Sequence, residues 1–148
     1  MAGTVIADNL QAASTSTLVI KNGVASTPPT IQDSAGTEIG KFCRAWVNFD
    51  GTGTFSPNPS TTKIRASFNV SSITDNGTGD YTVNFTNAMP DANLSVSVMQ
   101  SFNLTGAPNT GYGSSAYAVN TTSCRISVWG SISGNRLDVE SCSVQVFR

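Results

Sequence analysis

The sequence predicts an all-β protein: an antiparallel β-sandwich or jelly-roll-like body of about eight short strands, preceded by an extended N-terminal arm. Three observations predict this class. The 148 residues include 20 Ser, 18 Thr, 13 Asn and 13 Gly, which suit strands and turns better than helices. Apolar and polar residues alternate in many short runs that glycine-rich turns separate. No segment shows a sustained helical period of apolar residues.

The expected strands follow one another at roughly regular spacing through the body. In chain order they are 42–49, 64–70, 81–85, 94–98, a short strand with Tyr117 and Val119, 125–129, a strand beginning with Leu137 and Val139, and 143–147. The run 64–70 alternates cleanly, with Ile64, Ala66, Phe68 and Val70 facing inward. The glycine-rich connection 75–80 and the strand 81–85 follow it, which is a hairpin signature.

The run 42–49 carries bulky side chains on both of its faces. One face holds Cys43, Ala45, Val47 and Phe49, and the other holds Phe42, Arg44, Trp46 and Asn48. This pattern is typical of a strand that is covered on both sides.

Residues 1–40 differ from the body, 41–148. They are mostly small and polar, and they contain the break Pro28-Pro29 and a turn-rich stretch at 32–37. A segment with so few apolar residues can hardly bury a core by itself. We therefore expect an extended arm that serves attachment or oligomerisation, packed against a partner chain or against the body.

Charge and composition exclude several function classes. Charged residues make up 11% of the chain and the net charge is −1, so no basic surplus exists to bind nucleic acid or an anionic membrane surface. No apolar run is long enough to insert into a membrane. The lack of histidine rules out His-based acid–base catalysis and His-ligated zinc. We expect a non-enzymatic protein that needs no metal or cofactor.

Two acidic groupings remain as weak candidates for chemistry. The loop 75–80 offers oxygen ligands for calcium, but a hairpin turn explains it better. Asp138 and Glu140 would share a face if they lay on a strand, as a carboxylate pair of the glycosidase kind. A solvated strand face is the simpler interpretation of that pair.

The three cysteines are Cys43, Cys124 and Cys142. An odd number of cysteines in a chain without a secretory signal argues against a disulfide framework. We expect them to act as buried small apolar residues. The sequence leaves open whether Cys124 and Cys142 pair.

The stretch from Thr105 to Ser114 is the longest turn-rich insertion in the body. Tyrosine gives rigid amphipathic contact area, and Ser, Gly and Asn give adaptable hydrogen bonds. Glycine-rich, tyrosine-bearing loops on a β framework are natural recognition surfaces. The candidate receptor-binding residues are therefore Asn109, Tyr112, Ser114 and Tyr117. The alternative is an ordinary surface loop with one core tyrosine.

Four runs of the sequence together form a specific pattern. They are RAWVNFDGTG (44–53), IRASFNVSSITDNGTGDYTVNF (64–85), AMPDAN (88–93) and, upstream, IKNGVASTPPT (20–30). In these runs the chain resembles a module of bacteriophage tail-fibre proteins, especially those of marine and cyanobacterial phages. The resemblance covers about residues 17–100 and fades beyond Phe102, as a variable receptor-facing region would. The stretch 56–62 departs from the pattern and looks like an insertion.

The resemblance implies a virion structural protein assembled in the bacterial host cytoplasm, a homotrimer that forms a short tail fibre or tail-tip module for host attachment. The family offers no catalytic motif to carry over. Because the chain begins at Met1, we expect a short gene product rather than a long shaft. The expected partners are further copies of the chain, other virion proteins, and a host surface saccharide or protein.

The arm is the expected point of attachment to the virion. Its candidate residues are Leu18 and Ile20 in an expected strand at 17–21, and Pro28, Pro29 and Ile31. Three other roles stay open. A capsid decoration or head-fibre protein would bind a capsid lattice, a tail assembly adaptor would bind only virion partners, and a surface-polysaccharide hydrolase would need Asp138 and Glu140 in a groove.

Overall fold

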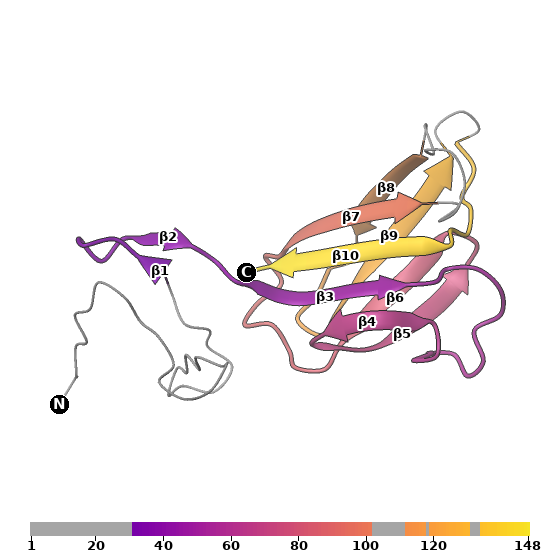
Figure 1. Ribbon diagram of the computed structural model, residues 1–148, viewed down its shortest axis with the longest axis horizontal. Helices are drawn as coiled ribbons and strands as arrows, with labels where there is room; N and C mark the ends of the chain where they lie inside the picture. The colour runs from indigo at the N-terminus through magenta and orange to yellow at the C-terminus, as the bar shows by residue number, and fades with distance from the viewer. Residues whose placement is uncertain (1–30, 102–111, 118, 131–133) are drawn as a thin grey trace, which may run out of the picture.

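The computed structural model describes residues 31–101, 112–117, 119–130 and 134–148, and it is all-β (Figure 1). The strands are β1 (Ile31–Gln32), β2 (Glu38–Gly40), β3 (Cys43–Phe49), β4 (Ile64–Phe68), β5 (Val70–Gly77), β6 (Asp80–Phe85), β7 (Ser95–Ser101), β8 (Tyr112–Tyr117), β9 (Ser123–Gly130) and β10 (Ser141–Phe147). Across these ranges, no helix is long and apolar enough to cross a membrane. The predicted fold class is confirmed.

The eight strands of the body form two four-stranded antiparallel sheets. The first sheet has the order β4-β3-β10-β7, and the second has the order β5-β6-β9-β8. Figure 1 shows the two sheets as stacked layers, with β10 running through the middle of the first. The hairpin β3-β4 lies in the first sheet, and the hairpins β5-β6 and β8-β9 lie in the second. Strands β7 and β10 return to the first sheet, so the chain crosses repeatedly from one layer to the other.

The core lies between the two sheets and is built from the inward residues of both. The first sheet contributes Ala45, Val47, Phe49, Cys142, Val144 and Val146, and the second contributes Val70, Ile73, Tyr81, Val83, Phe85, Cys124, Ile126 and Val128. The apolar positions of the alternating sequence pattern are therefore the positions that face the core between the sheets.

One face of strand β3 is buried as predicted, but its other face, which was expected to be covered, is partly exposed. Ala45, Val47 and Phe49 are buried, as the pattern predicted. On the opposite face Trp46 is 38% exposed, and Phe42, just before the strand, is 45% exposed. No described residue covers this second face in the way the sequence pattern led us to expect.

The predicted inward face of the run 64–70 is wrong for Ala66 and Phe68, which are exposed. Phe68 pairs with Trp46 and therefore shares its outward face, while a register shift near Phe49 lets Ile64 pack on the core. Asn69, at a φ of 54°, then turns the chain towards the second sheet, so Val70 begins a separate strand, β5. The hairpin partner of β6 is therefore β5, not the run 64–68.

Two other predicted boundaries are wrong. Tyr112 belongs to strand β8 rather than to a loop. Residues 137–140 lie in no strand, and the last strand begins at Ser141. The reason lies in contacts with distant residues. The Leu137 backbone N–H donates to Val128 O at 3.2 Å, and the Asp138 carboxylate accepts from Gly79 N–H and from the Tyr81 hydroxyl.

The segment 134–140 is tied to the core through Tyr81. The Tyr81 hydroxyl lies 2.6 Å from Asp138 Oδ1 and 2.8 Å from Gly51 O, and Asp138 Oδ1 also accepts from Gly79 N–H at 2.8 Å. Burial, with the neighbouring Asp138 carboxylate, raises the pKa of Tyr81 above its usual range. The phenol therefore stays a neutral donor that joins the core to the outer loop.

The described end of the arm is a hairpin, β1-β2, that projects away from the body (Figure 1). The turn predicted at 32–37 is present, and Asp33 Oδ1 accepts from Ala35 N–H at 2.9 Å and from Thr37 N–H at 2.8 Å. Ile31 and Ile39 are 42% and 64% exposed. Such a short hairpin has no core of its own.

All three cysteines are free. Cys124 and Cys142 are fully buried, as predicted, and they lie in different sheets rather than on neighbouring strands. Burial raises the pKa of each thiol to about 12, so neither forms an appreciable amount of thiolate near neutral pH. Cys43 is half-buried, and its thiol donates to Ala45 O at 3.2 Å.

Candidate recognition site

The outer face of the second sheet is polar and centres on Asp80. Asp80 begins β6, and its side chain is only 4% exposed. Arg125, on the neighbouring strand β9, binds it with both arms of its guanidinium: Nε to Oδ1 at 2.7 Å and Nη2 to Oδ2 at 2.9 Å. Arg136 also donates from Nη1 to Oδ2. Two arginines therefore share one carboxylate.

Tyr117, on β8, completes this group. Its hydroxyl lies 2.9 Å from both Asp80 oxygens, and the Arg125 guanidinium lies over its ring, 5.4 Å from the centroid. The register explains the meeting, because Thr82, Arg125 and Tyr117 lie opposite one another across three strands. Alternation then brings Asp80 to the same face. We call Asp80, Tyr117, Arg125 and Arg136 the Asp80 cluster.

The charges of the cluster are fixed by its hydrogen bonds. Burial disfavours ionisation of Asp80, but hydrogen bonds from Arg125 and Tyr117, with the charges of both arginines, outweigh it and lower the pKa of Asp80. The hydrogen bond to Asp80 likewise raises the pKa of Arg125. Two cations around one anion leave a surplus positive charge. Arg125 and Arg136 are 38% and 49% exposed, so this charge is open to a ligand.

Amide and hydroxyl side chains extend the polar face towards β5. Asn76 Nδ2 donates to Thr82 Oγ1 at 2.9 Å. Asn84 Nδ2 donates to Ser72 Oγ at 3.1 Å and to Thr74 Oγ1 at 2.9 Å. These bonds fix the side chains in place and lower the entropy that ligand binding would otherwise cost. The result is an ordered surface of donors and acceptors.

Of the predicted receptor-binding residues, only Tyr117 is placed in the cluster. Ser114 lies on the opposite face of β8, where its hydroxyl donates to Val98 O of β7 at 3.1 Å. Tyr112 lies on β8, but its side chain falls outside the described part, as does all of Asn109. Of the predicted attachment residues, Ile31 lies in β1; Leu18, Ile20, Pro28 and Pro29 lie outside the described residues.

The two weak acidic candidates are accounted for by hydrogen bonds. Asp75 Oδ1 accepts from Gly77 N–H at 2.8 Å in the β5-β6 turn, and both Asp80 oxygens are bound by arginine. Within the described ranges, no group of three or more acidic or cysteine residues could hold a metal ion. Asp138 is held by Tyr81 and Gly79, and it does not lie on a strand with Glu140. The shared strand face expected for this pair is thus wrong.

Sequence reasoning missed Asp80, Arg125 and Arg136 as site residues. The alternation of 125–129 already placed Arg125 on the face away from the core, so one signal was present. The pairing of β9 with β6 and β8, which brings Arg125 to Asp80 and Tyr117, depends on long-range register. No family model, curated protein or solved structure matches the chain.

Proposed function

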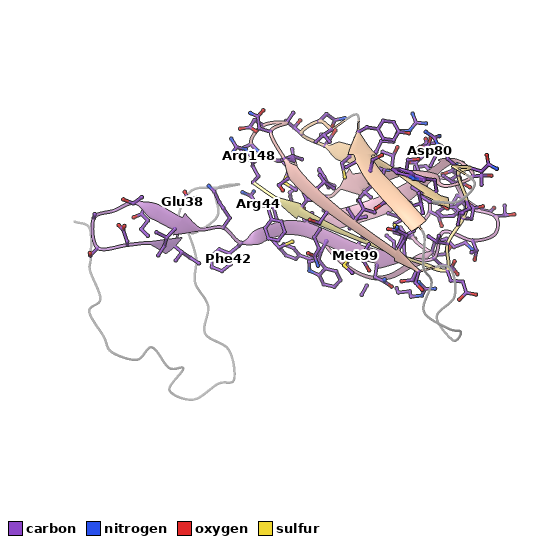
Figure 2. The ribbon with its side chains drawn as sticks, turned by 90° about the horizontal axis from the view of Figure 1, so that it is seen from above. Glu38, Phe42, Arg44, Asp80, Met99 and Arg148 are labelled. Carbon is purple, nitrogen blue, oxygen red and sulfur yellow. The ribbon has the colours of Figure 1, made fainter. Side chains whose placement is uncertain are left out.

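We propose that this chain is a non-enzymatic structural protein of a bacteriophage virion, a short tail fibre or tail-tip module that attaches to the host as a homotrimer. The observation that carries the proposal is the contrast between the two outer faces of the sandwich. One face holds exposed aromatic side chains, which suit assembly, and the other holds an ordered polar surface, which suits recognition. Figure 2 shows Asp80 on the opposite side from Met99.

The resemblance of 44–53 and 64–85 to tail-fibre modules supports the same role, since these segments include β4, β5 and β6 and all but the first residue of β3. The chemistry of the polar face fits a saccharide. Asn, Thr and Tyr offer donors and acceptors for hydroxyl groups, and arginine binds carboxylates or phosphates. The surplus positive charge of the Asp80 cluster favours a host glycan with acidic groups.

The first test is the location of the chain on phage particles. Antibodies raised against the purified full chain are applied to virions of the phage that encodes it and viewed by electron microscopy. We expect gold label at the tail. Label spread over the capsid would contradict the tail role and favour a decoration protein. Virions without label, alongside labelled controls for a known tail protein, would contradict a virion role altogether.

The second test concerns the polar face. We expect Arg136→Ser to weaken binding of the full chain to host cells about tenfold or more, because a charge-assisted hydrogen bond contributes roughly 1.5–3 kcal/mol. Arg65→Ser is the matched control, since Arg65 also faces an aspartate, Asp50, at 3.7 Å, but on the first sheet. Binding is measured by retention of labelled protein on cells. Equal binding by both variants would remove the Asp80 cluster from recognition.

A further inference from the structure

The described residues expose six large apolar side chains, and none of them lies on the second sheet. They are Ile31 at 42%, Ile39 at 64%, Phe42 at 45%, Trp46 at 38%, Phe68 at 56% and Met99 at 73%. Ile31 and Ile39 belong to the β1-β2 hairpin; the others belong to the first sheet or lead into it. One chain therefore carries two separate apolar surfaces, an arm and a face.

Three of these side chains are aromatic and belong to β3 and β4 or lie directly before β3; we define Phe42, Trp46 and Phe68 as the aromatic patch. Trp46 and Phe68 are directly opposite in the β3-β4 pairing. Phe42 lies directly before β3, four residues from Trp46, and it is likewise exposed. Aromatic side chains contribute most of the energy of many protein interfaces because they bury a large area. An exposed aromatic patch of this kind is typical of a surface that binds another protein.

The β1-β2 hairpin needs a surface to pack on. Its strands are two and three residues long, and an isolated two-stranded hairpin is at best marginally stable in water. Its two isoleucines are its apolar material, and both are exposed. From Gly40 to the turn at 35 the hairpin reaches about 17 Å, and three strand spacings across the first sheet cover about 14 Å. The hairpin is therefore long enough to lie across such a face.

We propose that the β1-β2 hairpin of one copy of this chain packs on the aromatic patch of a second copy. The geometry favours a second copy over the hairpin's own body. Only Lys41 and Phe42 separate β2 from β3, and the hairpin projects beyond the start of β3, away from the sheets (Figure 1). The same two residues would have to reverse the chain for it to cover its own face. Figure 2 shows Phe42 at this junction.

This inference rests on the proposed function only in placing copies of the chain side by side. Exchanged arms give each copy one hairpin donated and one received, which is how a closed ring of identical subunits satisfies a head-to-tail contact. The polar face on the second sheet stays uncovered in this arrangement. Assembly and recognition thus use opposite sides of the same sandwich.

Cysteine cross-linking of the full chain tests the contact. Chains with Ile39→Cys are mixed with chains with Phe68→Cys, allowed to exchange, and oxidised. We expect a covalent pair of chains between the two variants, several-fold more abundant than with Ser115→Cys, an exposed site on the outer face of the second sheet. Equal yields with Phe68→Cys and Ser115→Cys would overturn the proposal. So would a doubly substituted chain that cross-links only within itself.

Light scattering of Phe68→Lys provides the second measurement. Phe68 is more than half exposed, so the body should keep its fold. We expect the mass in solution to fall to that of a single chain, with Thr122→Lys, an exposed position in the loop before β9, as the control that keeps the wild-type mass. An unchanged oligomeric mass for Phe68→Lys would overturn the proposed contact. It would leave virion labelling, and with it the proposed function, unaffected.

Discussion

Gly79→Ala is expected to destabilise the protein by about 2–5 kcal/mol. Gly79 has a φ of +60°, and a Cβ there would lie 2.7 Å from Leu137 N and 2.8 Å from Leu137 O, and closer still to Val128 O. These atoms are backbone, so no side chain can rotate to make room. The methyl group would push the 134–140 segment off the sheet and break the bond from Gly79 N–H to Asp138. Urea unfolding measures the loss.

Gly134→Ala is the control that separates the clash of an added Cβ from the strain of a left-handed backbone conformation. Gly134 has a φ of +65°, nearly that of Gly79, but a Cβ there meets nothing within 4 Å. Its cost is therefore the left-handed strain alone, about 1–2 kcal/mol. An equal loss of unfolding free energy in the two variants would contradict this prediction. It would mean that the close contacts of Gly79 with Leu137 and Val128 do not contribute to stability.

Asp80→Asn is expected to cost about 1–3 kcal/mol near neutral pH, because it removes the charge that two arginines and a tyrosine bind. The new amide also places N–H donors against the donors of Arg125. The free energy of unfolding, from urea midpoints at pH 7, measures the loss. The matched control is Asp33→Asn, because the amide oxygen can still accept the two backbone N–H groups of the arm turn.

The same variant predicts a pH dependence of stability. The pKa of Asp80 is lowered in the folded protein, so its contribution is present above the unfolded value near 4 and disappears as the pH falls through the folded value. The difference between wild type and Asp80→Asn should therefore be largest at pH 7 and shrink steadily below about pH 4. A difference that stays constant down to pH 2 would show that the carboxylate charge is not what stabilises the cluster.

The fold class could be predicted from the sequence because short-range alternation reports which strands are half buried. Positions 45, 47 and 49 show this plainly. The boundary between β4 and β5 could not be predicted, because one left-handed residue, Asn69, divides a run that alternates without interruption. Positions 137–140 alternate in the same way but are held by Asp138 and Leu137 contacts to distant residues. Alternation therefore indicates which side chains are buried, but it does not indicate which strands pair with one another.

The candidate site was predicted in part. A tyrosine on a β framework was enough to single out Tyr117, whereas Ser114, three positions away, lies on the other side of its strand. The arginines and Asp80 come from separate strands and a loop, so only the register brings them together. Residues 42 and 46 show the converse, since the sequence showed bulky side chains on the second face of their strand but did not show what covers them.

The central place of β10 in the first sheet has a consequence for biosynthesis. Strands β3 and β7 are neighbours only through β10, which is formed by residues 141–147. While a ribosome is still translating earlier codons, the first layer is divided and both strands have an unpaired edge. A nascent chain cut short before this point would have no complete core. Only chains that include β10 should therefore close the first sheet and complete the core of the sandwich.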